Sequence, residues 1–276
     1  MTFLRHLNYG SDLVDSTKPK DIEEYRKWLY NKHGVDSIDA LKSYYHTVTS
    51  KMKVDFELSE FWTSLPEYLM EADSIYLMKT KYPLITGQAV PKLYVKSFES
   101  FFLKTYRKNI LTNSHWPNPP QEGWMLPDNW FERVNDILRT IVVVKYFDGV
   151  KFLCDQVCGL CQKVPLTSHI DFEAKEEGYY AAHLYIKPEF EIPAVNWDTR
   201  KIKVYIEIQI TTQLQEVIRQ LLHTYYEDRR VNSQNNSNKW QWDYKSDEFV
   251  ANYLGHILHY VEGMIMEIRD KQGGIL

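Results

Sequence analysis

Cysteine, glycine and long apolar runs are all scarce in this chain of 276 residues, and each scarcity excludes a class of protein. Three clustered cysteines do not build a disulfide framework, so a reducing cytoplasm is the expected compartment. The 11 glycines form no glycine-rich loop after a strand, which excludes P-loop and dinucleotide-binding folds. No apolar run approaches the roughly 18 residues of a membrane span. The N-terminal sequence has no signal-peptide core, so we expect neither membrane insertion nor secretion.

An excess of one charge is lacking as well. The chain has 33 Lys and Arg against 37 Asp and Glu, which gives a net charge of -4. A global positive field for nucleic acid is therefore excluded, although a local basic patch is not. With 44% hydrophobic and 14% aromatic residues, the composition is that of an ordinary globular protein with a substantial core.

The hydrophobic pattern predicts helices around a short mixed sheet. Helical periodicity is expected at these stretches: 20–80, 96–110, 149–163, 213–230 and 247–269. Strands are expected where β-branched or alternating apolar residues occur: 137–147, 179–186 and 202–210. In the last helix, six apolar residues are expected to face inward: Leu254, Ile257, Leu258, Val261, Ile265 and Ile268. The fold class is thus α+β, with an N-terminal helical segment and a C-terminal helix.

Polar side chains recur on the predicted strands, where a purely structural sheet does not need them. Asp136 stands before the first strand, Tyr179 and His183 share a face of the second, and Glu207 and Gln209 share a face of the third. Each of these residues taken alone has a simple structural interpretation. A carboxylate in mid-strand, however, must face water or a site, because burying it unpaired is costly.

Basic residues of the segment 96–110 accompany these carboxylates. Lys96, Ser100 and Lys104 are four residues apart, so a helix would align them along one face. Two carboxylates with lysines opposite suit a magnesium–phosphate site. Magnesium takes one or two carboxylates and fills its other positions with substrate oxygens and water, while lysines offset phosphate charge.

Four short motifs, in this order, resemble the synthetase domain of the RelA/SpoT alarmone synthetases. They are KSFESFFLK (96–104), NDILRTIVVVKYFDGV (135–150), EGYYAAHLYI (177–186) and VYIEIQITTQLQ (204–215). The resemblance covers about residues 90–230, and His223 and Tyr226 match positions where the family's next helix often carries a His and a Tyr. It implies a nucleotidyltransferase-like sheet. The expected division is a helical segment 1–89, a synthetase core 90–230, and a polar loop with C-terminal helix 231–276, all in one compact unit.

The resemblance also implies roles for the matched residues. Asp136 and Glu207 would hold Mg²⁺, and Glu207 would help to deprotonate the acceptor hydroxyl. His183 and Gln209 would orient the acceptor or position Glu207, and Tyr179 would stack on the acceptor base. The ATP-binding residues would be Tyr94, Lys96, Ser100 and Lys104.

Four positions depart from the family pattern, because arginines that are frequent there are absent. The residues found instead are Tyr94, Ile141, Tyr180 and Thr211. Tyr94 is able to stack on adenine in place of the arginine. The loss of positive charge predicts weaker binding of a highly phosphorylated acceptor, which indicates either an unusual acceptor or a reduced activity.

The predicted activity is transfer of the β,γ-diphosphate of ATP to a ribose 3′-hydroxyl, by a small enzyme without the family's His-Asp hydrolase motif. The acceptor is a guanine nucleotide, as in alarmone synthesis, or the 3′-CCA end of tRNA, as in a translation toxin. A toxin would pair with an antitoxin protein, and small family members are often homo-oligomers. The alternative from another class is a degenerate nucleotide- or RNA-binding module. The clustered Cys154, Cys158 and Cys161 favour core packing over a metal site.

Overall fold

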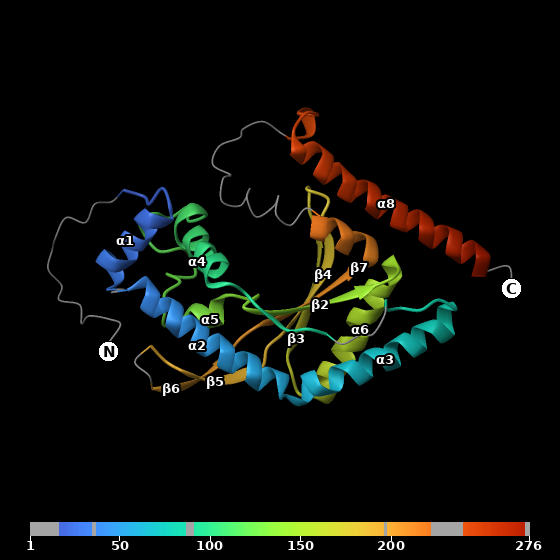
Figure 1. Cartoon of the computed structure of the whole chain (residues 1–276), viewed down its shortest axis with the longest axis horizontal. Coiled ribbons are helices and arrows are strands. Elements are labelled where there is room, and N and C mark those ends of the chain that lie inside the picture. The colour runs from blue at the N-terminus through green and yellow to red at the C-terminus, as the bar shows by residue number, and fades with distance from the viewer. Residues whose placement is uncertain (1–16, 35–36, 87–90, 196–197, 222–239, 274–276) are drawn as a thin grey trace. The chain divides into compact units, whose positions relative to one another are not determined.

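The computed structural model describes residues 17–34, 37–86, 91–195, 198–221 and 240–273 (Figure 1). The chain forms two compact units, each assembled from three separate stretches. Unit 1 comprises Met1–Ser59, Leu93–Arg139 and Lys187–Ile206; unit 2 comprises Glu60–Lys92, Thr140–Ile186 and Glu207–Leu276. The predicted division into three consecutive stretches stays a prediction. The C-terminal part of the expected helix 213–230, with His223 and Tyr226, and the loop 231–239 lie outside the described residues.

Unit 1 is mainly helical. Its elements are α1 (Ile22–His33), α2 (Ile38–Glu57), β1 (Tyr94–Val95), α4 (Phe98–Tyr106), the π-helical turn η1 (Arg107–Leu111), α5 (Trp130–Arg133), and the hairpin of β5 (Glu189–Pro193) and β6 (Thr199–Lys203). Side-chain caps fix three helix starts, because Asp21, Ser37 and Ser97 each accept a hydrogen bond from the backbone N–H three residues later. Helix α1 ends at Gly34, whose φ of 62° is the left-handed conformation that glycine adopts without strain.

Aromatic side chains make the core of unit 1. Tyr45 packs on Phe101 with ring centroids 4.6 Å apart, and both rings are buried. Near α1, the rings of Trp28 and Trp124 meet edge to face at 4.9 Å, so the proline-rich segment before α5 is packed structure.

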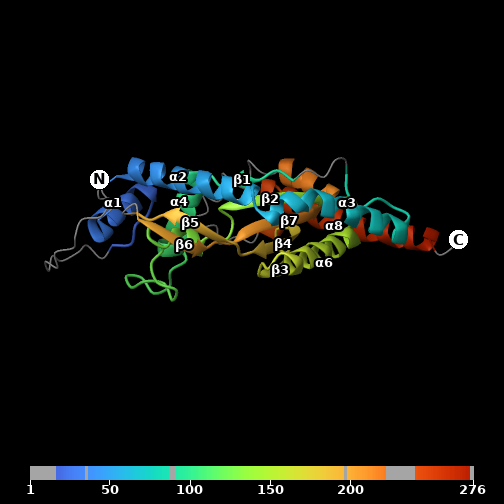
Figure 2. The same ribbon diagram turned by 90° about the horizontal axis from the view of Figure 1, so that it is seen from below.

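Unit 2 contains α3 (Glu60–Thr80), α6 (Phe147–Lys163) and α8 (Asp247–Gly273) (Figures 1 and 2). Helix α6 contacts α3, α8 and the sheet. The three cysteines lie on α6; Cys154 and Cys161 are buried, as the core interpretation predicted, and burial raises the pKa of Cys154 to about 12. None of the helices in the described ranges is both long enough and apolar enough to cross a membrane.

The main sheet has the strand order β1-β2-β7-β4-β3. Its other strands are β2 (Leu138–Val144), β3 (Ser168–Ala174), β4 (Tyr180–Ile186) and β7 (Ile206–Thr212). Strands β3 and β4 are antiparallel, with Asp171 opposite His183 and Glu173 opposite Ala181. The predicted α+β class, a mixed sheet flanked by helices, is confirmed.

Three details of the prediction are wrong. The single strand expected at 202–210 is two strands, because residues up to Lys203 pair with β5 while β7 starts at Ile206 in the other sheet. Lys96 precedes α4 rather than lying on it, since Ser97 is the N-cap. The apolar stripe of the last helix is largely exposed, because other residues of α8 face inward: Ala251, Asn252, Gly255, Glu262 and Arg269.

Candidate active site

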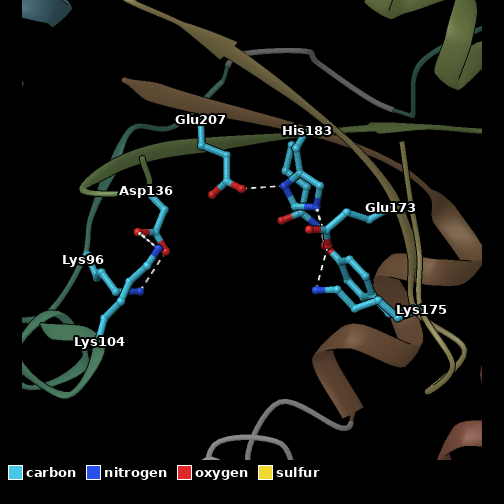
Figure 3. A network of polar contacts seen from close by, with 9 residues as sticks. Lys96, Lys104, Asp136, Glu173, Lys175, His183 and Glu207 are labelled. Atoms are coloured by element: carbon cyan, nitrogen blue, oxygen red, sulfur yellow. Dashed lines mark hydrogen bonds and ion pairs between the residues drawn. The ribbon is translucent and has the colours of Figure 1, made fainter. Parts of the chain in front are cut away.

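A cluster of two lysines and one carboxylate forms in unit 1, just before β2. Figure 3 shows Lys96 and Lys104 converging on Asp136. The Lys96 Nζ donates to Oδ2 of Asp136 and the Lys104 Nζ donates to Oδ1, both at 2.9 Å. The Lys96 backbone is fixed from two sides, since its N–H donates to the Ile137 carbonyl and its own carbonyl accepts from the Tyr45 hydroxyl.

The charges of this cluster are strongly coupled. Burial raises the pKa of Asp136, but Lys104 and Lys96 outweigh that effect and lower the pKa to about 2. Burial lowers the pKa of Lys96, while Asp136 opposes that shift. The pKa of Lys108 is also lowered, first by burial and then by Lys104. Two cations share one carboxylate, so the cluster carries a net positive charge that suits a phosphate chain.

Magnesium chemistry is compatible with the donor set. The Asp136 carboxylate is ionised at neutral pH, and hard carboxylate oxygens are what Mg²⁺ prefers. Both of its oxygens are bound by lysines here, so a metal ion would take the place of one ammonium group. In the described ranges no three His, Cys, Asp or Glu side chains are grouped to hold a metal, whereas Mg²⁺ needs only one or two carboxylates.

A second polar cluster, in unit 2, is built on β4 and β7. The Nδ1 of His183 lies 2.5 Å from Oε1 of Glu207, and both residues are buried. A mid-strand carboxylate is thus paired with an imidazole, which explains why β7 tolerates it. The contact places Glu207 and His183 on the same face of the sheet.

Tyr179 extends this chain of contacts. Its hydroxyl lies 3.2 Å from the other imidazole nitrogen, Nε2 of His183, and accepts from Nε2 of Gln209 at 2.9 Å. In the tautomer that carries its proton on Nδ1, His183 donates to Glu207 and its Nε2 accepts from the Tyr179 hydroxyl. Burial, and then the charge of Glu207, raise the pKa of Tyr179 above its ordinary value. The Tyr179 phenol is therefore neutral, and His183 and Gln209 both hold its hydroxyl.

Two residues that the sequence interpretation missed join this cluster from the β3 side. Glu173 Oε2 lies 3.4 Å from His183 Nε2 and 2.7 Å from Lys175 Nζ (Figure 3). The Lys175 Nζ lies over the Tyr179 ring, 5.1 Å from its centroid. Recognition of β3 as a strand would have revealed Glu173, because the register puts it on the face that carries His183.

The turn that carries Tyr179 is backed by α8. Gly178 has a φ of 75°, and a Cβ added at Gly255 of α8 would collide with the Gly178 carbonyl oxygen. His256 holds the same turn through two contacts of 2.8 Å, one with the Glu176 carbonyl and one with the Tyr180 hydroxyl. The Tyr180 ring stacks on His259 at 3.6 Å. Both histidines therefore support the turn and the Tyr180 ring.

The predicted site residues thus form two groups, each within one unit. Lys96, Lys104 and Asp136 meet in unit 1, where Ser100 lies in the first turn of α4 next to Ser97 and Tyr94 lies on β1 with 45% of its surface exposed. The unit 2 group consists of Tyr179, His183, Glu207 and Gln209.

Solved structures define the relationship of this fold to known proteins. No family model matches the chain, and no curated protein matches it. Two structures of small alarmone synthetase 1 from Bacillus subtilis are each 16% identical to it and cover 81% of this chain and 99% of that chain. The TM-scores are 0.50 for one and 0.51 for the other, which was solved bound to its product pppGpp. The chain therefore has the fold of a small alarmone synthetase.

Proposed function

We propose that this protein is a small synthetase of the RelA/SpoT type that transfers the β,γ-diphosphate of ATP to a ribose 3′-hydroxyl. One observation carries the proposal: on a fold shared with an alarmone synthetase, Glu207, His183, Tyr179 and Gln209 form one continuous chain of polar contacts. A sheet needs no such chain for its stability. The four motif matches of the sequence support the same assignment.

The donor side of the proposal rests on the lysine cluster of unit 1. Lys96 and Lys104 would release Asp136 and bind the phosphate oxygens of ATP, with Ser100 and Tyr94 contributing to phosphate and adenine. Asp136, freed from its lysines, would become a ligand of Mg²⁺, and Glu207 is proposed as the second carboxylate. When bound, the ion would neutralise charge on the transferring phosphates.

The acceptor side rests on the unit 2 cluster. Tyr179 would present its ring to the acceptor base, with its hydroxyl held by His183 and Gln209. Glu207 would accept the proton of the acceptor 3′-hydroxyl as that oxygen bonds to the β-phosphorus of ATP. The bond between the β-phosphorus and the oxygen bridging to the α-phosphate breaks, and AMP leaves. His183 would orient the Glu207 carboxylate for this proton transfer.

A guanine nucleotide is the first acceptor to consider, since the similar synthetase was solved with pppGpp. Two positions where the family often has an arginine favour a second candidate, the 3′-CCA end of tRNA. These positions hold the uncharged residues Tyr180, which contacts His256 and His259, and Thr211, which is buried, so neither supplies a cation for acceptor phosphates. An acceptor with few phosphates near the reacting ribose would not need those cations. Pairing with an antitoxin would accompany the tRNA activity.

A transfer assay tests the proposal and separates the candidates. The protein is mixed with Mg²⁺ and ATP labelled at the γ-phosphate, and GDP, GTP and bulk tRNA are offered separately. Label on a guanine nucleotide with AMP release indicates an alarmone synthetase, and label only on tRNA indicates a toxin. Glu207→Gln should abolish transfer, whereas Glu191→Gln, an exposed carboxylate of β5, should not. Binding of an ATP analogue without transfer to any acceptor would favour the degenerate binding module.

A further inference from the structure

Polar contacts, rather than a buried apolar stripe, determine where α8 lies on unit 2. Among the described residues of α8, Ala251 is the only buried apolar one, and the buried side chains besides it are polar: Asn252, Glu262 and Arg269. Apolar burial has no preferred direction, whereas hydrogen bonds and ion pairs require a defined distance and angle. The position of α8 along its own axis is therefore set by the partners of its polar side chains.

Arg269, near the end of α8, joins this helix to two others. Its Nη1 donates to the hydroxyl of Tyr76 on α3 at 2.7 Å, and its Nη2 donates to Oδ2 of Asp148 on α6 at 2.6 Å. The Tyr76 hydroxyl in turn donates to Oδ1 of Asp148 at 2.6 Å, so each of the three side chains contacts the other two. One guanidinium thus connects α3, α6 and α8.

Two further tyrosines restrict the orientation of this guanidinium. Its central carbon lies 5.0 Å from the ring centroid of Tyr146 and 5.5 Å from that of Tyr82, and the two rings meet edge to face. A planar group that stacks on aromatic rings and donates through two nitrogens has one compatible position. A buried ion pair of this kind adds little net stability compared with apolar packing, and its best-attested role is to fix a register.

The contacts with the Tyr179 turn lie towards the other end of α8. Gly255 closely approaches Gly178, and the His256 side chain contacts the Tyr180 hydroxyl and the Glu176 carbonyl. The 14 steps from Gly255 to Arg269 span about 21 Å of helix. A helix advances about 1.5 Å per residue, so a shift by a single residue at one end would break the contacts at the other.

We propose that Arg269 is a positioning residue for the acceptor: its contacts with Tyr76 and Asp148 fix α8 in the register at which Gly255 and His256 hold the turn of Tyr179. Arg269, α8 and Tyr179 all belong to unit 2, whereas the donor lysines Lys96 and Lys104 belong to unit 1. Loss of Arg269 should therefore impair the acceptor side and spare the donor side. The effect on the acceptor rests on the proposed function, while the effect on the turn does not.

Amide hydrogen exchange of the full chain without ligand tests the structural part. Arg269→Met should accelerate exchange of the amides in 175–180 about tenfold or more and leave those of β2 unchanged. Lys271→Met is the matched control, because it removes an exposed cation of the same helix end that pairs with Glu267, and it should change nothing. Tyr76→Phe, a milder change that keeps the ring, should give a smaller increase in the same amides.

Two results of this measurement would overturn the proposal. One is unchanged exchange of the amides in 175–180 in both Arg269→Met and Tyr76→Phe. The other is an equal acceleration in β2, which would show that Arg269 only stabilises unit 2 as a whole. Unchanged helical circular dichroism would show that the variants fold.

Steady-state kinetics with the acceptor that takes up label in the wild type tests the functional part. Arg269→Met should raise the KM for that acceptor about 10- to 100-fold and change the KM for ATP by less than about twofold. Arg269→Lys should restore only part of the loss, because an ammonium group is a point charge that does not reproduce the fork of the guanidinium. An equal rise of both KM values would contradict the role of Arg269. A wild type without transfer to any acceptor would contradict the proposed function instead, and hydrogen exchange would still decide whether Arg269 holds the turn.

Discussion

Replacement of Asp136 by asparagine should destabilise the folded chain by at least about 2 kcal/mol at pH 7. The pKa of Asp136 falls from 3.8 to about 2 in the folded state, and the side chain is only 19% exposed. At about 1.36 kcal/mol for each tenfold change in proton affinity, that difference corresponds to about 2.4 kcal/mol. The neutral asparagine side chain would also leave the Lys96 ammonium, 12% exposed, without a counter-charge.

The same substitution should change the acid limb of the stability curve. Because the folded-state pKa is depressed, the stabilisation is complete above about pH 5 and is lost as the pH falls towards 2. About 1 kcal/mol should disappear by pH 3 and about 2 kcal/mol by pH 2. The free-energy difference between wild type and Asp136→Asn should shrink accordingly.

Urea unfolding followed by tryptophan fluorescence, at pH 7 and at pH 3, measures both effects. Asp155→Asn is the matched control, because Asp155 pairs with Lys151 on the exposed face of α6 and should cost less than about 0.5 kcal/mol. Equal stability of wild type and Asp136→Asn at pH 7, or a difference that does not change with pH, would refute the assignment of Asp136 as a lysine-stabilised anion.

Three further substitutions test packing away from the charged cluster, each read by the midpoint of urea unfolding. Gly255→Ala should destabilise by about 1–3 kcal/mol, because the added Cβ would meet the backbone of Gly178. Gly263→Ala should stabilise by up to about 1 kcal/mol, since a Cβ added there would meet no atom within 4 Å beyond its chain neighbours and its own helix backbone, and alanine favours the helix. Tyr25→Phe should cost about 1–3 kcal/mol, because it removes the acceptor of the buried Asn109 amide. A stabilising Gly255→Ala together with a destabilising Gly263→Ala would contradict the contact at Gly178.

The sequence was sufficient to predict elements whose pattern is strong and local. Strands β2 and β4 and helices α6 and α8 lie where their periodicity indicated. Strand β3 was missed because it alternates exposed and half-buried residues at the sheet edge and has few apolar positions. The break between β6 and β7 was missed for another reason. Ile202 to Ile210 alternate without interruption, and only the pairing of β6 with β5 separates the two strands.

The candidate site was predictable where spacing along one element sufficed. Tyr179 and His183, four residues apart and so on one face of a strand, do meet. Lys96 and Lys104 both bind Asp136, although Lys96 precedes α4 and the helical spacing expected for the two lysines does not apply. Glu173 and Lys175 were missed because no motif marks them and because strand β3, whose pairing with β4 brings Glu173 to the face of His183, was not recognised. The face of α8 that packs on unit 2 was not predictable either. Its apolar stripe is the usual signal of a buried face, and only the close approach at Gly255 shows that the other face is the inner one.

The close approach of Gly178 and Gly255 predicts which variants a genetic screen would recover. The last helix contributes no side chain to the Glu207–His183–Tyr179–Gln209 chain, yet the close approach of Gly255 and the His256 side chain hold the turn from which Tyr179 extends. A chain that ended before α8 would keep every residue proposed to contact a nucleotide. It would lose the contacts that hold the turn of Tyr179 in place. A screen for inactive variants should therefore recover stop codons and bulky replacements between Asn252 and His256 as readily as changes in the acidic and basic residues themselves.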